Sequence, residues 1–402
     1  MTGSIKRGRL WAVVIGIGLA LSPIHNLWLT NLVTNNGVVG LFLPAFGSAI
    51  WIIATLYFLF VADNWQDVND KGKLVFSWRR IDWGDRRVVI PLIVIVVAMG
   101  LSGITSDTLG KKVAPFLMGL SLLSLYLVAR KLGKDMFLPL AIGAGLASLG
   151  IISYALWHPG VMTGGFVFEK NYDIATGFIL LGTALFIHKW QWLLASLALV
   201  AMFLSGSPEA VFVLGVMSLV VLWRRDWNNQ LIIALIPIVV IMSIWFSVGT
   251  GQKLYQLTGY ILRSDLIKQG KQPPLDGTEE RRALSGRIEI AKDAMVNLKP
   301  LGEGYGLTKV GKVLMVHNVP LVIVQQLGWV GILAGLAWVW VSTYSLIKSK
   351  WKYVWVLILA LSVFDYYMWL QLAPFWWVAI GVSLSSHIQS DLVFRKAKIE
   401  GK

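Results

Sequence analysis

Arginines cluster around the start of a predicted helix in the long loop of the chain. Arg281 and Arg282 precede Ser285, and Arg287 follows it. Ser285 suits the N-cap of a helix over residues 285–299, which places Arg287 in the first turn. Free N–H groups, the partial positive charge of a helix start and a guanidinium fork together favour a bound diphosphate. A solvated cationic patch that faces lipid headgroups is the alternative interpretation.

Two further groups of residues have side chains that can accept a proton or bind a charged substrate. His317 stands beside Asn318 where the long loop is expected to re-enter the membrane, and histidine accepts a proton near neutral pH. Lys170, Asn171 and Glu209 are expected near the outer ends of two spans. Charges at membrane depth are costly, so they are usually paired or functional. The structural alternatives are a hydrogen-bonded histidine at a helix end and charged side chains that reach the membrane surface.

The composition indicates which elements must position these residues. Of 402 residues, 56% are hydrophobic and only 14% are charged, whereas soluble domains carry roughly a quarter charged residues. We therefore expect an all-α, polytopic membrane bundle whose 20 Trp residues suit the two membrane interfaces. The absence of Cys excludes disulfides and thiolate metal sites. Cationic loops explain the net charge of +15, and no nucleic-acid motif accompanies it, so no nucleic-acid partner is expected.

Hydropathy predicts about twelve membrane-spanning helices, since a helix needs roughly 20 apolar residues to cross the hydrocarbon core. The predicted spans are residues 10–31, 37–62, 88–106, 113–129, 136–157, 172–188, 190–205, 208–223, 230–249, 318–347, 353–369 and 372–389. With both termini in the cytoplasm, the inner segments hold most of the 36 Lys and Arg residues. The short outer loops then hold only Lys111, Lys112 and Lys170. This agrees with the positive-inside rule and indicates an even number of spans.

The same topology places the long loop outside the cytoplasm. We expect a single integral membrane domain, residues 1–402, with an extracytoplasmic loop at residues 250–318. Loops of this length are usually functional or disordered, and this one is not of low complexity. Its predicted helix over 285–299 has apolar residues at helical spacing and ends at Pro300. The apolar positions are Ile288, Ala291, Met295 and Leu298.

An ordered series of short motifs runs through this loop and into the next span. It begins with Ser285-Gly286-Arg287 and continues with Pro300-Leu301-Gly302-Glu303-Gly304, His317-Asn318 and Gln326-Leu327-Gly328-Trp329-Val330-Gly331. An earlier segment, from Gly165 and Phe166 to Asn171 and Ala175, precedes a middle span. The series resembles the O-antigen ligase and polymerase superfamily over about residues 160–335.

This resemblance implies a GT-C-like fold and a metal-independent, inverting glycosyltransferase without a cofactor. The donor is a glycan on a polyprenyl (undecaprenyl) diphosphate carrier, and the acceptor is a hydroxyl of a glycan or of lipid A-core. The reaction takes place on the external face of the bacterial inner membrane, among membrane lipids. The resemblance implies catalytic roles for His317 and Arg287. We expect Lys170, Asn171, Arg282, Glu209 and Asn318 to bind the substrates.

The sequence departs from the family at the outer end of a middle span. The family carries Ser-Arg-Gly there, whereas this chain has Ser205-Gly206-Ser207-Pro208-Glu209. Lys170 is the natural substitute for the missing arginine, and Arg282 is the other candidate. The motifs leave open whether the enzyme is a ligase or a polymerase, which would need a second cationic site such as Arg263, Lys268 and Lys271.

A transporter or flippase without chemistry is the alternative function. It predicts broken spans and polar residues at mid-membrane depth, for which Asp365 is the best candidate in the sequence.

Overall fold

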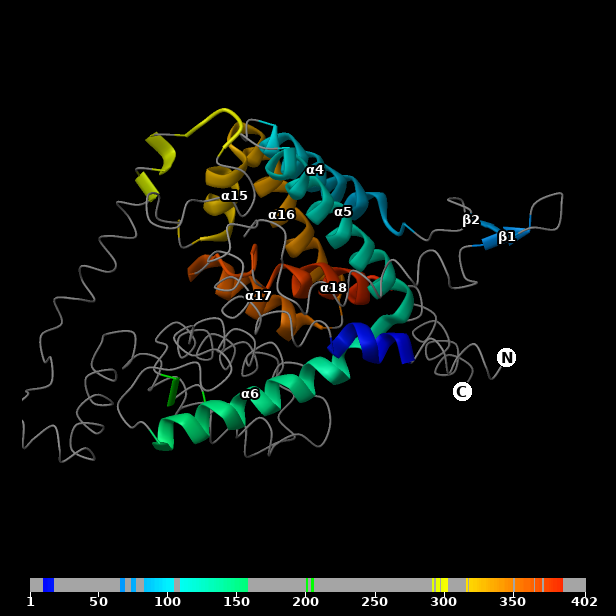
Figure 1. Cartoon of the computed structure of the whole chain (residues 1–402), viewed down its shortest axis with the longest axis vertical. Helices are drawn as coiled ribbons and strands as arrows, with labels where there is room; N and C mark the ends of the chain where they lie inside the picture. Colours follow the sequence, from blue (N-terminus) through cyan, green and yellow to red (C-terminus); the bar gives the residue numbers. More distant parts are fainter. Residues whose placement is uncertain are drawn as a thin grey trace, which may run out of the picture. The chain divides into compact units, whose positions relative to one another are not determined.

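The computed structural model describes residues 10–17, 66–68, 74–76, 83–104, 109–157, 200–201, 204–205, 291–292, 294–296, 298–302, 316, 318–349, 351–364, 366–370 and 372–385 (Figure 1). The chain forms two compact units. The first comprises Met1–Leu140, Ala294–Trp355 and Tyr366–Lys402, and the second comprises Ala141–Asp293 and Val356–Asp365. The predicted spans 37–62, 172–188, 208–223 and 230–249 lie outside the described residues, as do most of 10–31 and 190–205.

The described elements are helices, apart from one small antiparallel hairpin. The hairpin pairs β1 (Gln66–Val68) with β2 (Leu74–Phe76), with Gln66 opposite Phe76. The helices are α4 (Arg86–Gly103), α5 (Leu109–Leu132), α6 (Phe137–Trp157), α15 (Val319–Leu327), α16 (Trp329–Lys348), α17 (Lys352–Phe364) and α18 (Ala373–Ser383). A short 3-10 helix, Gly133–Met136, joins α5 to α6. The predicted helical class is confirmed for the described residues, with the hairpin as an addition.

Within the first unit, α5 packs against both α4 and α18, while α16 packs against α4 and α15 (Figure 1). Glycines allow close approach in two of these contacts. Gly119 of α5 lies against Val96 of α4, and Gly381 of α18 lies against the backbone of Tyr126 in α5. Small residues at such contacts are typical of helices that pack within a membrane.

Three helices in the described part of the chain are long and apolar enough to cross a membrane. They are α4, residues Pro115–Leu132 of α5, and α16. Their exposed faces carry large apolar side chains, including Ile90, Leu117 and Leu336. An apolar face that is not covered by protein is costly in water and ordinary against lipid. These features are consistent with a membrane protein, and the predicted spans 88–106 and 113–129 are confirmed as helices.

The last two predicted spans are shorter helices than expected. The prediction 353–369 corresponds to α17, which ends at Phe364, and residues 366–370 form turns. The prediction 372–389 corresponds to α18, which ends at Ser383. Pro374 stands in the first turn of α18, where a missing N–H costs nothing. Arg130 donates a hydrogen bond to the carbonyl of Leu384, just beyond this helix. If α18 continued for another turn, a backbone amide would donate to this carbonyl, so the arginine replaces that helical hydrogen bond.

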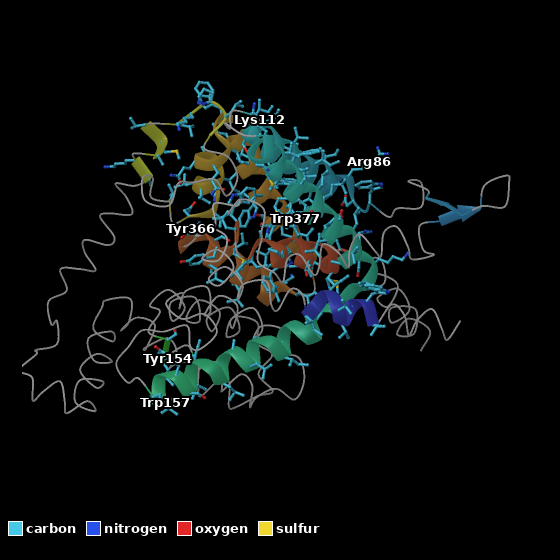
Figure 2. All side chains as sticks on the ribbon, in the orientation of Figure 1. Arg86, Lys112, Tyr154, Trp157, Tyr366 and Trp377 are labelled. Carbon is cyan, nitrogen blue, oxygen red and sulfur yellow. The ribbon has the colours of Figure 1, made fainter. Side chains whose placement is uncertain are left out.

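Tryptophans form much of the core between α16 and α18, rather than lying only at the two interfaces as composition suggested. Trp338 stacks on Trp376 with ring centroids 5.5 Å apart, and Trp376 meets Trp377 edge to face. Trp377 is labelled in Figure 2. The Trp376 indole donates to the hydroxyl of Ser342 at 2.8 Å, so its polar atom is satisfied inside the core.

The ends of four helices meet at one end of the first unit. The Tyr344 hydroxyl near the end of α16 donates to Asp85, which precedes α4. The Trp340 indole of α16 donates to the carbonyl of Arg87 at 2.9 Å. Arg130 near the end of α5 reaches Leu384 after α18. The charge pattern assigned these ends to the same side of the membrane, so the packing agrees with the predicted directions of these helices relative to one another.

Asp85 is the N-cap of α4 and should contribute to stability at neutral pH. Its carboxylate accepts from the Arg87 amide at 2.9 Å and from the Tyr344 hydroxyl. The Tyr344 hydrogen bond, followed by the Arg87 amide, holds the pKa of Asp85 below its usual value. Asp85→Ala should lower the free energy of unfolding by about 1 kcal/mol, whereas Asp85→Asn should retain the cap.

Because the pKa of Asp85 is lower in the folded state, the contribution of the ionised carboxylate is present above its ordinary pKa in the unfolded chain and is lost as the pH falls through the lower folded pKa. Thermal midpoints of the purified protein in neutral detergent, compared at pH 7 and in acid, would measure this. Equal midpoints for Asp85→Ala and wild type at pH 7 would contradict the role.

Candidate functional site

The helices α15 and α16 form an antiparallel hairpin that turns at Gly328 (Figure 1). Gly331 of α16 lies against Ile323 of α15, and Gly335 lies against Pro320, so the contacts run in opposite directions along the two helices. Gly328 has φ +69°, a left-handed conformation that an α-helix cannot continue through. The prediction of one continuous span over 318–347 is therefore wrong, because the chain reverses where that span was expected to continue.

The reversal changes the position of Asn318. This residue caps α15: its side-chain oxygen accepts from the Leu321 amide at 3.2 Å, and its carbonyl accepts from Val322 at 2.9 Å. At 1.5 Å per residue, Asn318 lies about 15 Å along α15 from Gly328, or about half the length of α16. We expected Asn318 at the mouth of the long loop. The hairpin places it beside the middle of α16 instead.

The turn of this hairpin is held by the end of the long loop. We call the packing of Pro300–Gly302 against Gln326–Trp329 the loop–hairpin contact. The Trp329 amide donates to the carbonyl of Pro300 at 2.9 Å. A Cβ on Gly302 would lie 2.2 Å from the carbonyl oxygen of Gln326, and one on Gly328 would lie 2.3 Å from the Gly302 nitrogen. Two backbones thus pass so closely that only glycine fits on either side.

Two buried glutamines secure the same region from within α15. Gln326 is 0% exposed, and its side-chain oxygen accepts from the Trp369 indole at 2.9 Å. The side-chain oxygen of Gln325 accepts from the Val316 amide at 3.1 Å. Sequence reasoning recorded Gln326 as part of a motif and missed both roles. Adjacent amides in an apolar segment were the available signal, since buried polar groups in membrane helices are usually hydrogen-bonded.

These hydrogen bonds fix the chain on both sides of His317. Val316 is buried and held by Gln325, while the Asn318 amide donates to the Val316 carbonyl at 2.9 Å. Gly302 is held by the loop–hairpin contact. The connection from Gly302 to Val316 therefore begins and ends at anchored points. Such rigid supports are what a site needs to place a reacting group within the small tolerance of catalysis.

Of the predicted site residues, Asn318 alone is among those that the structure describes. The others lie outside the described residues, as does Asp365: they are Arg287, His317, Lys170, Asn171, Arg282 and Glu209. In the described ranges, no group of three or more His, Cys, Asp or Glu residues could hold a metal ion.

The predicted loop helix over 285–299 is helical at 291–292 and 294–296 and ends before Leu298. Its buried face differs from the prediction, because Ala294 is buried and Met295 is 37% exposed. Leu298, which was expected on the apolar face, follows the helix and adopts no helical conformation. Lys299 and Pro300 follow in the same non-helical stretch, where the chain turns into the loop–hairpin contact.

The described residues thus supply positioning rather than reactive groups. They join two separated motifs, residues 300–302 and 326–329, and they fix where α15 begins relative to α16. Comparison with protein-family models, curated proteins and solved structures finds no match to this chain.

Proposed function

We propose that this chain is a metal-independent, inverting glycosyltransferase of the O-antigen ligase or polymerase type. It moves a glycan from a polyprenyl diphosphate carrier to a hydroxyl acceptor, on the external face of the bacterial inner membrane. In this proposal the chain crosses the membrane about twelve times, and both termini lie in the cytoplasm. The loop–hairpin contact supports this proposal, because two pieces of the motif series, far apart in the sequence, lie against each other where α15 ends and α16 begins.

In the proposed reaction, the acceptor oxygen attacks the anomeric carbon from the face opposite the diphosphate. The new carbon–oxygen bond forms as the bond from the anomeric carbon to the diphosphate oxygen breaks, which inverts the configuration. His317 takes the proton of the acceptor hydroxyl. Arg287 and Lys170 stabilise the negative charge that grows on the departing polyprenyl diphosphate. Asn171, Arg282, Glu209 and Asn318 contact the substrates.

The hairpin adds a constraint on how the acceptor enters. Asn318 begins α15 about 15 Å from Gly328, and half of a typical hydrocarbon core is also about 15 Å. In this proposal Gly328 marks the outer side, so the acceptor hydroxyl descends into the bundle to reach the start of α15. Non-helical backbone at that depth requires partners within the protein, and Gln325 supplies one for Val316.

The direct test is transfer in vitro from a purified lipid-linked donor. His317→Ala should lower the rate by about 10²–10⁴-fold, because it removes the general base. Arg287→Ala should lower it by about 10²–10³-fold, the usual cost of losing one charge-stabilising donor. Lys170→Arg should retain activity that Lys170→Gln loses.

Lys112→Gln is the matched control for the loss of one cation. Lys112 is exposed, lies near the start of α5 and has no role in the proposed site (Figure 2). Full transfer by both Arg287→Ala and His317→Ala would contradict the proposed mechanism.

A transporter or flippase is the second candidate, and it is favoured by the short helix α15, whose start at Asn318 lies about 15 Å along the helix from Gly328. Discontinuous helices whose ends lie near mid-membrane depth are typical of substrate sites in transporters. Proteoliposomes that contain the lipid-linked donor distinguish the two functions. Movement of the donor between leaflets without any acceptor or turnover would support transport, whereas transfer that requires an acceptor would support the glycosyltransferase.

A further inference from the structure

A cationic surface lies where the start of α4 meets the end of α16. Arg86, which Figure 2 labels, and Arg87 are exposed in the first turn of α4. Lys348 is exposed in the last turn of α16. The charges of both Arg87 and Lys348 act on the carboxylate of Asp85. That carboxylate already accepts hydrogen bonds from the Tyr344 hydroxyl and the Arg87 amide, so one engaged acid lies close to the charges of Arg87 and Lys348.

An aromatic side chain is fixed beside these cations. Trp340 is 53% exposed, and its indole donates to the carbonyl of Arg87 at 2.9 Å. Its ring stacks with Tyr344, with centroids 6.3 Å apart. Partly exposed tryptophans with a satisfied N–H are typical of the level where lipid headgroups meet acyl chains. The cations therefore lie beside a tryptophan of the kind that is typical of the membrane interface.

The same two helices continue from this point with exposed apolar faces. Their exposed side chains are Ile90, Ile93 and Val97 on α4, and Leu336, Val339 and Ile347 on α16. Because Trp340 and Tyr344 near the end of α16 are hydrogen-bonded to Arg87 and Asp85 at the start of α4, both helices run away from the cationic end. We call the exposed cations Arg86, Arg87 and Lys348, the Trp340 ring and these apolar side chains the α4–α16 surface. Along this surface, cations, an aromatic ring and apolar side chains follow one another in the order in which a phospholipid presents phosphate, glycerol and acyl chains.

We infer that the α4–α16 surface binds a membrane phospholipid with an anionic headgroup, whose phosphate lies at Arg87 and Lys348 and whose acyl chains follow the exposed faces of α4 and α16. In the topology predicted from charge, this lipid belongs to the cytoplasmic leaflet. The surface is separate from the loop–hairpin contact, so this inference does not depend on the proposed glycosyltransferase activity. A bound lipid here would join the ends of the two helices that Asp85 and Tyr344 already connect.

The test uses native mass spectrometry of the purified full-length protein in neutral detergent, titrated with dioleoyl phosphatidylglycerol. Wild type should retain phosphatidylglycerol in preference to phosphatidylethanolamine. The double variant Arg87→Gln/Lys348→Gln should bind phosphatidylglycerol at least about tenfold more weakly, since each basic residue near a membrane surface attracts anionic lipid measurably. Arg87→Lys/Lys348→Arg keeps both charges and should bind as wild type does.

Lys112→Gln/Lys292→Gln is the matched control, since it also removes two exposed cations and leaves the α4–α16 surface unchanged. It should bind phosphatidylglycerol as wild type does. If this control bound phosphatidylglycerol as weakly as Arg87→Gln/Lys348→Gln does, the protein would attract anionic lipid through its net charge in general, and the inference would be overturned. Undiminished binding by Arg87→Gln/Lys348→Gln would also overturn it, as would retention of undecaprenyl phosphate in preference to phosphatidylglycerol.

Discussion

Gly302→Ala is expected to lower both the stability of the protein and its rate of glycan transfer. The added Cβ would lie 2.2 Å from the carbonyl oxygen of Gln326 and 2.5 Å from the Gly328 nitrogen. These are backbone atoms at the turn of the α15–α16 hairpin, so no flexible side chain can move aside. Gly302 also has φ +67°, where an alanine is strained. Strain and overpacking typically cost about 1–3 kcal/mol each, so a large fall in the thermal midpoint is expected.

The effect on transfer follows from what the loop–hairpin contact holds. If Gly302 moves away from Gly328, the connection from Gly302 to Val316, which leads to His317, loses the anchor at its start. A displacement of about 1 Å can cost a catalytic site about 10²-fold in rate. We therefore expect a loss of about that size for Gly302→Ala, and a similar loss for Gly328→Ala, measured below the thermal midpoint of each variant.

Gly150→Ala is the control for these substitutions. Gly150 lies in α6, and nothing lies within 4 Å of a Cβ at that position. Alanine is favoured over glycine within a helix, so this variant should be at least as stable as wild type. A wild-type midpoint for Gly302→Ala would contradict the close backbone contact. A lowered midpoint with a normal transfer rate would show that the contact stabilises the fold without positioning the site.

Gly381→Ala is expected to separate α18 from α5. Its Cβ would lie 2.5 Å from the carbonyl oxygen of Tyr126 and 2.8 Å from the side chain of Ala129. Helix backbones in membranes approach this closely only at small residues, so the two helices must shift. The hydrogen bond from Arg130 to Leu384, which lies at the same end of α18, should then be lost. We expect a loss of about 1–3 kcal/mol in the free energy of unfolding.

Gly335→Ala is the matched control at a helix–helix contact. The nearest atom to a Cβ there is the carbonyl oxygen of Pro320, at 3.5 Å, which is an ordinary contact distance. This variant should keep the wild-type midpoint, as followed by thermal unfolding in neutral detergent. Equal midpoints for Gly381→Ala and Gly335→Ala would contradict the tight packing of α18 on α5. We expect the folded fraction of Gly381→Ala to retain transfer, because Gly381 lies outside the loop–hairpin contact.

Hydropathy and charge alone predicted several helices correctly. The predicted spans 88–106, 113–129 and 136–157 correspond to α4, α5 and α6. Long apolar stretches with cations at alternate ends leave few other arrangements in a bilayer, because every backbone group must be hydrogen-bonded within the protein. The predicted directions of α4, α5, α16 and α18 relative to one another also agree with the hydrogen bonds that join their ends.

The candidate site was predicted less completely. Arg287 and His317 were chosen from their types and from a resemblance, and their roles stay predictions. The sequence reasoning placed Asn318 at the outer mouth of a long span, whereas the structure makes it the N-cap of a short helix. The roles of Gln325 and Trp369 were missed, because a hydrogen bond between distant segments leaves no periodic trace in the sequence.

The sequence by itself determined the helical class of the described residues, the presence of helices long and apolar enough to cross a membrane, and the position of the motifs along the chain, because these depend on local hydrophobicity, charge and spacing. Only the tertiary structure decided that residues 318–347 reverse at Gly328. Glycine in an apolar stretch is equally compatible with a continuous helix and with a turn. The close packing of Gly302 against Gly328 selects the turn, since the two backbones meet there and the Trp329 amide finds its partner in Pro300 rather than in the preceding helical turn.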